Sequence, residues 1–231
     1  MSVSASLVMS SLIGYLFGAI PVGYLLVKAK SGIDLRQFGS GRTGGTNAFR
    51  AGGLAVGVAT SVFDVLKAAC AVWSVQAIFG DTIAAKWLPW AAATAGVFSI
   101  VGHNWSAFIG WRGGAGTGPN VGWAGALWFP IVPIAIVTVV VVLLGIGIAS
   151  IASLAMAAAV PISFLVLYVA GIKPFDSSVA YIVGGLISAG IIVWSLRPNL
   201  RRLIAGNERL VGPRARRNAN NQSVTDQETA E

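Results

Sequence analysis

The 231-residue chain carries 55% hydrophobic and only 10% charged residues, with a formal net charge of +8 and a mean hydropathy of +0.76. These values exclude an ordinary water-soluble domain, because a soluble core cannot bury so much apolar sequence. The single cysteine and the single histidine exclude a disulfide framework and a metal site built from several histidines.

Long apolar runs predict an all-α integral membrane protein. A bilayer core needs about 20 apolar residues for each helical crossing, and several runs reach this length with few or no charges. In chain order we expect helices over residues 5–27, 54–79, 84–101, 119–129, 133–148, 150–171 and 179–196. This gives about seven transmembrane helices. Five crossings are the alternative, because the fourth segment is short.

The basic residues set the expected orientation. Short cytoplasmic loops collect Lys and Arg, and the first, third and last polar segments hold most of the 16 found here. We therefore expect the N-terminus outside, the C-terminus in the cytoplasm and an odd number of crossings. Residues 1–212 are expected to form a single transmembrane domain. Residues 213–231, rich in polar and charged side chains, are expected to form a disordered cytoplasmic tail.

Three unusually polar segments lie on the same expected side of the membrane: "GSGRTGGTNAFR" (39–50), "GHNWSAFIGWRGGAG" (102–116) and "LRPNLRRLIAGNE" (196–208). Clustered glycines let backbone N–H groups converge on an anion, and arginine forks match phosphate oxygens. The alternative for the first segment is a flexible loop with positive-inside arginines. Its G-x-G-x-x-G match is not a dinucleotide fingerprint, because no strand precedes it. The three segments together predict one anion site.

Three ionisable residues lie in or at the ends of apolar runs. Asp64 and Lys67 are three apart and face the same side of a helix. Ionisable groups at such depth are costly unless they are paired or face a polar cavity, so this pair indicates either a functional pocket or an internal ion pair. His103 stands at a helix end, where a lone histidine is more often a capping or interfacial residue than a catalyst.

The chain resembles a known family in several successive blocks. "GAIPVGYLLVK" from Gly18, "GIDLRQFGSGRTGGTNAFR" from Gly32, "FDVLKA" from Phe63 and the second and third polar segments are similar to the blocks of bacterial acyl-phosphate-dependent glycerol-3-phosphate acyltransferases. The agreement extends to about Gly212. The resemblance implies a multi-pass inner-membrane enzyme with its site on the cytoplasmic face. This enzyme would transfer a fatty acyl group from acyl phosphate to the 1-hydroxyl of sn-glycerol 3-phosphate, giving lysophosphatidic acid without a cofactor or metal.

The resemblance also implies roles for individual residues. It implies catalytic roles for Ser40, Asn47, Arg50 and Asn199. Glycine N–H groups would bind the acyl phosphate or stabilise a developing oxyanion. The residues implied to bind substrate or phosphate are Gly39, Gly41, Arg42, Thr46, Lys67, His103, Arg112, Gly113, Gly114, Gly116, Arg202 and Glu208.

The chain departs from the family pattern at several positions: Arg42, Thr43 and Gly45 in the first block, Ser106 for a proline, Ala115 for a lysine and Leu196 for a histidine. The missing lysine removes a charged contact worth about 1.5–3 kcal/mol. Arg42 and Arg112 are the candidates to replace this cation. Three hypotheses follow: an active acyltransferase, a descendant with an altered substrate, or a non-catalytic membrane protein that binds phosphate-bearing lipid precursors.

Two further functions, transport and nucleic-acid binding, fit the sequence less well. Transporters usually carry paired broken helices in related halves, whereas here the polar residues gather at one face and no halves repeat. The basic stretch from residue 197 to 217 adjoins the membrane, so it favours contact with anionic lipid headgroups over nucleic acid. The resemblance implies acyl phosphate and glycerol 3-phosphate as partners, and the basic stretch favours membrane lipids. The sequence leaves the oligomeric state open.

Overall fold

A computed structural model describes residues 1–208 and 210–211, and the expected tail over residues 213–231 lies outside this part of the chain. Within the described residues every regular element is a helix, apart from one isolated bridge between Ile148 and Leu210. The prediction of an all-α protein is confirmed.

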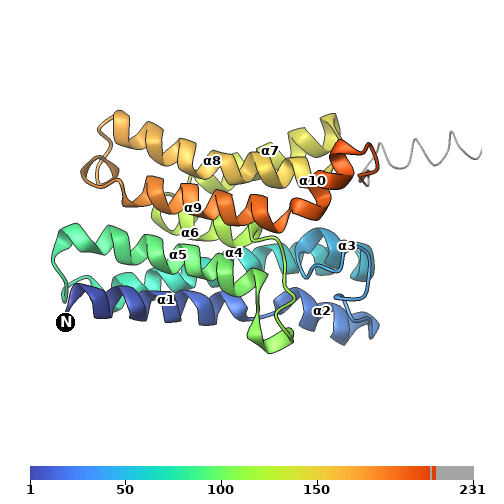
Figure 1. The fold of residues 1–231 in the computed structure, drawn as a ribbon, viewed down its shortest axis with the longest axis horizontal. Coiled ribbons are helices and arrows are strands. Elements are labelled where there is room, and N and C mark those ends of the chain that lie inside the picture. Colours follow the sequence, from blue (N-terminus) through green and yellow to red (C-terminus); the bar gives the residue numbers. More distant parts are fainter. Residues whose placement is uncertain (209, 212–231) are drawn as a thin grey trace, which may run out of the picture.

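The helices run side by side along one axis (Figure 1). The longer ones are α1 (Val3–Ala19), α4 (Leu54–Phe79), α5 (Leu88–Asn104), α8 (Ala149–Val169) and α9 (Ala180–Ser195). Two shorter ones, α6 (Thr117–Leu127) and α7 (Ile131–Gly145), complete the bundle. Each of the seven apolar runs therefore contains a helix.

Two helix boundaries differ from the expected ones for a local reason. The first run breaks at Pro21 into α1 and α2 (Val22–Ser31), because proline lacks the backbone N–H that would continue the helix. The fourth helix begins at Thr117, and Trp128 is its C-cap. Its 11 residues extend about 16 Å, which is about half of a hydrocarbon core.

By length and composition, three helical segments of the described chain can cross a membrane: Val3–Ser31, Leu54–Phe79 and Ala149–Val169. A fourth is possible if α9 and α10 (Arg197–Ile204), which are bent by 62° at their junction, count as one span. The membrane character of the chain is thus supported, whereas seven crossings and their orientation remain predictions.

Small residues bring the helices close together. A Cβ atom on Gly18 of α1 would lie 2.0 Å from the carbonyl oxygen of Ser99 on α5, and Gly14 meets Ala95 in the same way. Close backbone approach at small residues is the usual packing of membrane helices, because lipid supplies little hydrophobic drive between them. Bulky side chains fill the neighbouring core, where the rings of Trp123 and Phe164 are 5.4 Å apart.

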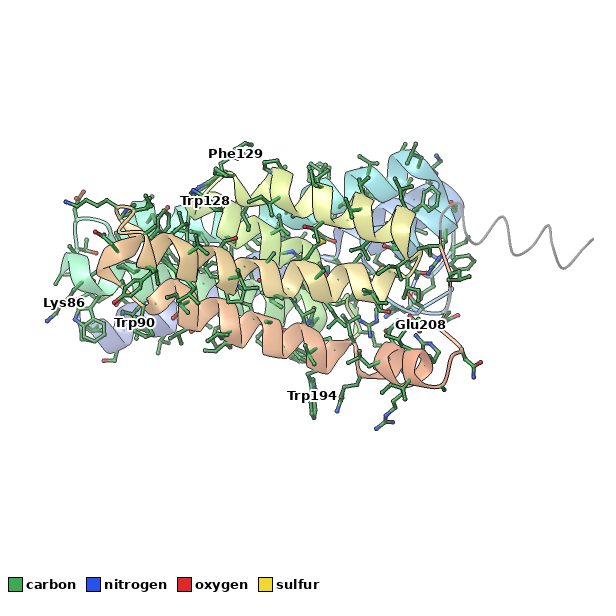
Figure 2. The ribbon with its side chains drawn as sticks, turned by 90° about the horizontal axis from the view of Figure 1, so that it is seen from above. Lys86, Trp90, Trp128, Phe129, Trp194 and Glu208 are labelled. Carbon is green, nitrogen blue, oxygen red and sulfur yellow. The ribbon has the colours of Figure 1, made fainter. Side chains whose placement is uncertain are left out.

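The polar segments gather at one end of the bundle. Figure 1 shows α2, α3 (Gly45–Gly52) and α10 together at this end, beside the connection between α5 and α6. The opposite end carries Lys86 and Trp90, far from Glu208 (Figure 2). This arrangement agrees with the expectation that the three polar segments lie on one side. We call the end that holds α3 and α10 the polar end.

Candidate functional site

Asn47 organises the first glycine loop. Its side-chain oxygen accepts a hydrogen bond from the backbone N–H of Ser40 at 3.2 Å, while its amide nitrogen donates to the carbonyl oxygens of Phe38 and Arg42, both at 2.9 Å. The residue is only 3% exposed. Gly39 has a φ of +57°, and a Cβ atom there would lie 2.3 Å from the Asn47 oxygen. The structure therefore supports a positioning role for Asn47 rather than direct contact with substrate.

Arg42 turns inward from the same loop. Its Nη2 donates to the carbonyl oxygen of Ser195 at the end of α9, and its buried Nη1 has no partner in the described part of the chain. Burial and the nearby Arg202 lower the pKa of Arg42, whereas Glu208 raises it. A guanidinium with an unpaired N–H beside a second arginine is well suited to bind an oxyanion.

Glu208 organises the third polar segment. Its Oε1 accepts from Asn199 Nδ2 at 2.7 Å and from Ser150 Oγ at 3.2 Å, and its Oε2 accepts from Arg202 Nε at 2.8 Å. The Glu208 side chain is 6% exposed. A carboxylate repels phosphate, so this geometry points to a role in orienting Asn199 and Arg202 instead of the expected phosphate contact.

The second glycine loop packs on His103. The N–H of Gly113 donates to the carbonyl oxygen of Asn104 at 3.1 Å, and the N–H of Gly114 donates to that of His103 at 3.0 Å. The expectation that these two N–H groups cradle an anion is therefore not met in this conformation, because backbone carbonyls already accept them. A Cβ atom on Gly114 would lie 2.0 Å from His103 Nε2, so glycine is required here for close approach.

The two glycine loops also contact each other. The backbone N–H of Thr43 donates to the carbonyl oxygen of Gly113 at 3.3 Å. Gly116, with a φ of +89°, forms the N-cap of α6 and faces the side chain of Asn104. Asn104 in turn donates from Nδ2 to Ser195 Oγ at 2.8 Å. Backbone and side-chain contacts thus connect the first loop, the second loop and the end of α9.

Asp64, Lys67 and His103 form a buried polar cluster between α4 and α5. Lys67 Nζ lies 2.9 Å from Asp64 Oδ1, 2.9 Å from His103 Nδ1 and 2.9 Å from the carbonyl oxygen of Ile20. The Asp64 contact is an ion pair without hydrogen-bond alignment, since Oδ1 has no hydrogen-bond partner among the described residues. Of the two alternatives for Asp64 and Lys67, the ion pair is present, and it also touches the single histidine.

Other expected site residues lie nearer the surface. Ser40, Thr46 and Arg112 are exposed, and Gly41, in the loop between Ser40 and Thr46, has a φ of +71°. Arg50 lies on α3. The sequence interpretation missed Asn104, Ser195 and Ser150, whose only signal was a polar side chain at the end of an apolar helix.

Comparison with known families assigns the chain to a family. The family model of glycerol-3-phosphate acyltransferase matches residues 8–206. The chain belongs to the glycerol-3-phosphate acyltransferase family. The matched residues include both glycine loops and the α10 segment, although Glu208 falls just outside them.

Individual relatives support the same assignment. The glycerol-3-phosphate acyltransferase of Gloeobacter violaceus is 33% identical over 86% of this chain and 91% of its own length, and that of Parasynechococcus marenigrum is 34% identical over 88% and 89%. The crystal structure of PlsY, an integral membrane glycerol 3-phosphate acyltransferase, in its glycerol 3-phosphate form has a TM-score of 0.75. The PlsY chain is 28% identical in sequence to this chain, and the match covers 90% of this chain and 96% of the PlsY chain. Its lysophosphatidic acid form gives a TM-score of 0.74.

The positions that depart from the acyltransferase family pattern are accommodated in the structure. Leu196 is buried in the core, and Ala115 packs against the same core. Ser106 donates to the carbonyl oxygen of Ala19 at 2.6 Å. A Cβ atom on Gly45 would lie 2.0 Å from Ser61 Oγ, so Gly45 lets α3 approach α4.

Proposed function

We propose that this chain transfers a fatty acyl group from acyl phosphate to the 1-hydroxyl of sn-glycerol 3-phosphate, forming lysophosphatidic acid and phosphate. Family membership over residues 8–206 and the likeness to PlsY structures in glycerol 3-phosphate and lysophosphatidic acid forms support this function. The acyl-phosphate donor is part of the proposal, and it follows from the resemblance of the sequence blocks.

One observation carries the proposal for the site: Arg42 brings the three polar segments together. Its guanidinium contacts Ser195, immediately before the third segment, and lies near Arg202 and Glu208. The same Ser195 accepts from Asn104 of the second segment. Both substrates carry phosphate, and an oxyanion bound beside Arg42 and Arg202 would offset the repulsion between these two cations.

The proposed reaction is a direct acyl transfer. The oxygen of the acceptor hydroxyl bonds to the carbonyl carbon of acyl phosphate, the bond from that carbon to the phosphate oxygen breaks, and the phosphate departs with the electron pair. The hydroxyl proton goes to a phosphate oxygen of the substrates. Two candidate bases of the described chain are already engaged, because His103 Nδ1 faces Lys67 and the Glu208 carboxylate accepts three hydrogen bonds.

We further propose that Arg42 supplies the cation that the family pattern places at Ala115. Arg42 is turned inward with a buried, unpaired Nη1, whereas Arg112, the other candidate, is exposed. In this proposal Arg50, Asn199 and Arg202 complete the phosphate site, with Ser40, Thr46, Gly41 and Gly116 at its edge. Asn47 and Glu208 hold these groups in position.

The remaining proposals concern the membrane. Residues 1–212 would form one domain with seven crossings, an outside N-terminus and the polar end in the cytoplasm of the inner membrane. The basic residues at that end support this orientation. Reporter fusions after residues 82 and 110 test it: an outside signal at the first and a cytoplasmic signal at the second are expected, and the reverse pattern contradicts it.

Acyl transfer by the purified protein tests the function. The protein in lipid or detergent receives acyl phosphate and labelled glycerol 3-phosphate, and labelled lysophosphatidic acid is measured, with Arg50→Ala as the control. Product that is lost in the control supports the proposal. No product from folded protein, with acyl-CoA also supplied as donor, would instead support an altered substrate or a binding-only descendant.

A further inference from the structure

The cluster of Asp64, Lys67 and His103 does more than neutralise charge, because it fixes where the histidine carries its hydrogen. A lysine ammonium group has donors and no acceptor, and a neutral imidazole has one donor nitrogen and one acceptor nitrogen. Lys67 Nζ lies 2.9 Å from His103 Nδ1. Nδ1 must therefore be the acceptor, which leaves the hydrogen on Nε2.

The competing arrangement fits the distances less well. If Nδ1 carried the hydrogen, it would donate to Asp64 Oδ1, which is 3.5 Å away and beyond the usual hydrogen-bond range. An N–H would then also face the Lys67 ammonium at 2.9 Å. All three residues are at most 6% exposed, so water cannot relieve this clash of donors.

The Nε2 nitrogen faces the second glycine loop. A Cβ atom on Gly114 would lie only 2.0 Å from Nε2, so any side chain at this position would block the approach to this nitrogen. Among the described residues the hydrogen bond of the His103 ring is made by Nδ1, with Lys67. An N–H at Nε2 that no side chain or carbonyl of the described chain accepts is therefore available to a ligand.

We propose that the Asp64–Lys67 pair holds neutral His103 with its hydrogen on Nε2, and that this N–H donates to an oxygen of a phosphate-bearing substrate at the second glycine loop. The identity of the substrate rests on the proposed function. In this scheme Asp64 and Lys67 are positioning residues, because they act through the imidazole. In this scheme His103 supplies the donor at the second glycine loop, where backbone carbonyls already accept the N–H groups of Gly113 and Gly114.

The single histidine makes the hydrogen position directly measurable. Full-length protein labelled with ¹⁵N in its imidazole, in detergent or lipid, gives one pair of ring-nitrogen signals. We expect Nδ1 to resonate as an unprotonated nitrogen and Nε2 as a protonated one. A protonated Nδ1 in the wild-type protein overturns the proposal. The measurement needs no turnover, so it is independent of whether the chain makes lysophosphatidic acid.

Substitution of Lys67 tests the cause. In Lys67→Met, Asp64 becomes the only charged neighbour of Nδ1 among the residues that the structure describes, so the hydrogen should move to Nδ1 and point at Asp64 Oδ1. Lys86→Met is the matched control, because Lys86 is exposed at the opposite end of the bundle (Figure 2). An unchanged Nε2–H signal in folded Lys67→Met contradicts the assigned role. If that variant does not fold, the wild-type signals and the ligand titration still test the proposal.

A titration identifies the ligand. Addition of glycerol 3-phosphate or of inorganic phosphate, in separate samples, should shift the Nε2–H signal of the wild-type protein. A shift with glycerol 3-phosphate alone assigns the contact to the acceptor substrate, and a shift with both assigns it to a phosphate oxygen that either substrate can supply. No shift with either ligand, or with lysophosphatidic acid, overturns the proposed donation. In folded Lys67→Met we expect kcat to fall about 10- to 100-fold, with the Lys86→Met rate unchanged.

Discussion

Arg42 of the first glycine loop donates a hydrogen bond to the carbonyl oxygen of Ser195, 153 residues further along the chain. This contact joins the loop to the end of α9 and places a guanidinium between the polar segments. Arg42 stands in the block where the chain departs from the family pattern, so its position gives that departure a physical role.

Replacement of Arg42 tests the proposed cation. We expect Arg42→Ala to lower kcat/KM for glycerol 3-phosphate about 10- to 100-fold, since a hydrogen bond to a charged group is worth about 1.5–3 kcal/mol. Arg201→Ala, which removes an exposed arginine of α10, is the matched control. Partial recovery in the double variant Arg42→Ala/Ala115→Lys would support the exchange of one cation for the other. A large loss of activity in Arg112→Ala, with full activity in Arg42→Ala, would show that Arg112 supplies the cation instead of Arg42.

Glu208 should act by orienting its neighbours. Glu208→Ala removes the acceptor for Asn199, Ser150 and Arg202, so we expect about a tenfold or larger loss of kcat/KM. Glu208→Gln retains a carbonyl acceptor for Asn199 and should lose less activity than the alanine variant. Steady-state kinetics of both variants provide the test. An activity order in which the glutamine variant is the worse of the two would contradict a positioning role.

The second glycine loop should tolerate no side chain at Gly114. In Gly114→Ala the new Cβ atom would lie 2.0 Å from His103 Nε2, so either the imidazole or the loop must move and activity should fall at least tenfold. Gly190→Ala is the control, because a Cβ atom there meets nothing within 4 Å. Acyl-transfer rates and the thermal midpoint in detergent distinguish a local effect from unfolding. Wild-type activity in Gly114→Ala would show that the close contact has no functional role.

Asn47 should contribute to stability as well as activity. Asn47→Ala removes the hydrogen bonds that shape the first glycine loop and leaves the carbonyl oxygen of Arg42 without its donor. We expect a loss of about 2 kcal/mol or more in the free energy of unfolding, together with lower activity. Asn207→Ala, at an exposed position, is the comparison. Denaturation followed by tryptophan fluorescence measures the difference, and equal stability of the two variants would refute the role assigned to Asn47.

The sequence by itself determined the helical membrane architecture and the family. Run length and the scarcity of charge decide where helices form, because a bilayer leaves few alternatives for an apolar segment of this size. The order of the sequence blocks decided the family, since several motifs at matching spacing are far more specific than one glycine pattern. The length of the apolar runs did not predict the break at Pro21, and it left open whether the short fourth segment crosses the membrane.

Only the tertiary structure decided what the polar residues do. A sequence cannot tell a free glycine N–H from one that a carbonyl already accepts, and at Gly113 and Gly114 the carbonyls of Asn104 and His103 accept them. Nor could it place Lys67 against His103, 36 residues away. Partners so distant along the chain are set by how the helices pack, and it is this packing that turns a set of matching residues into a site.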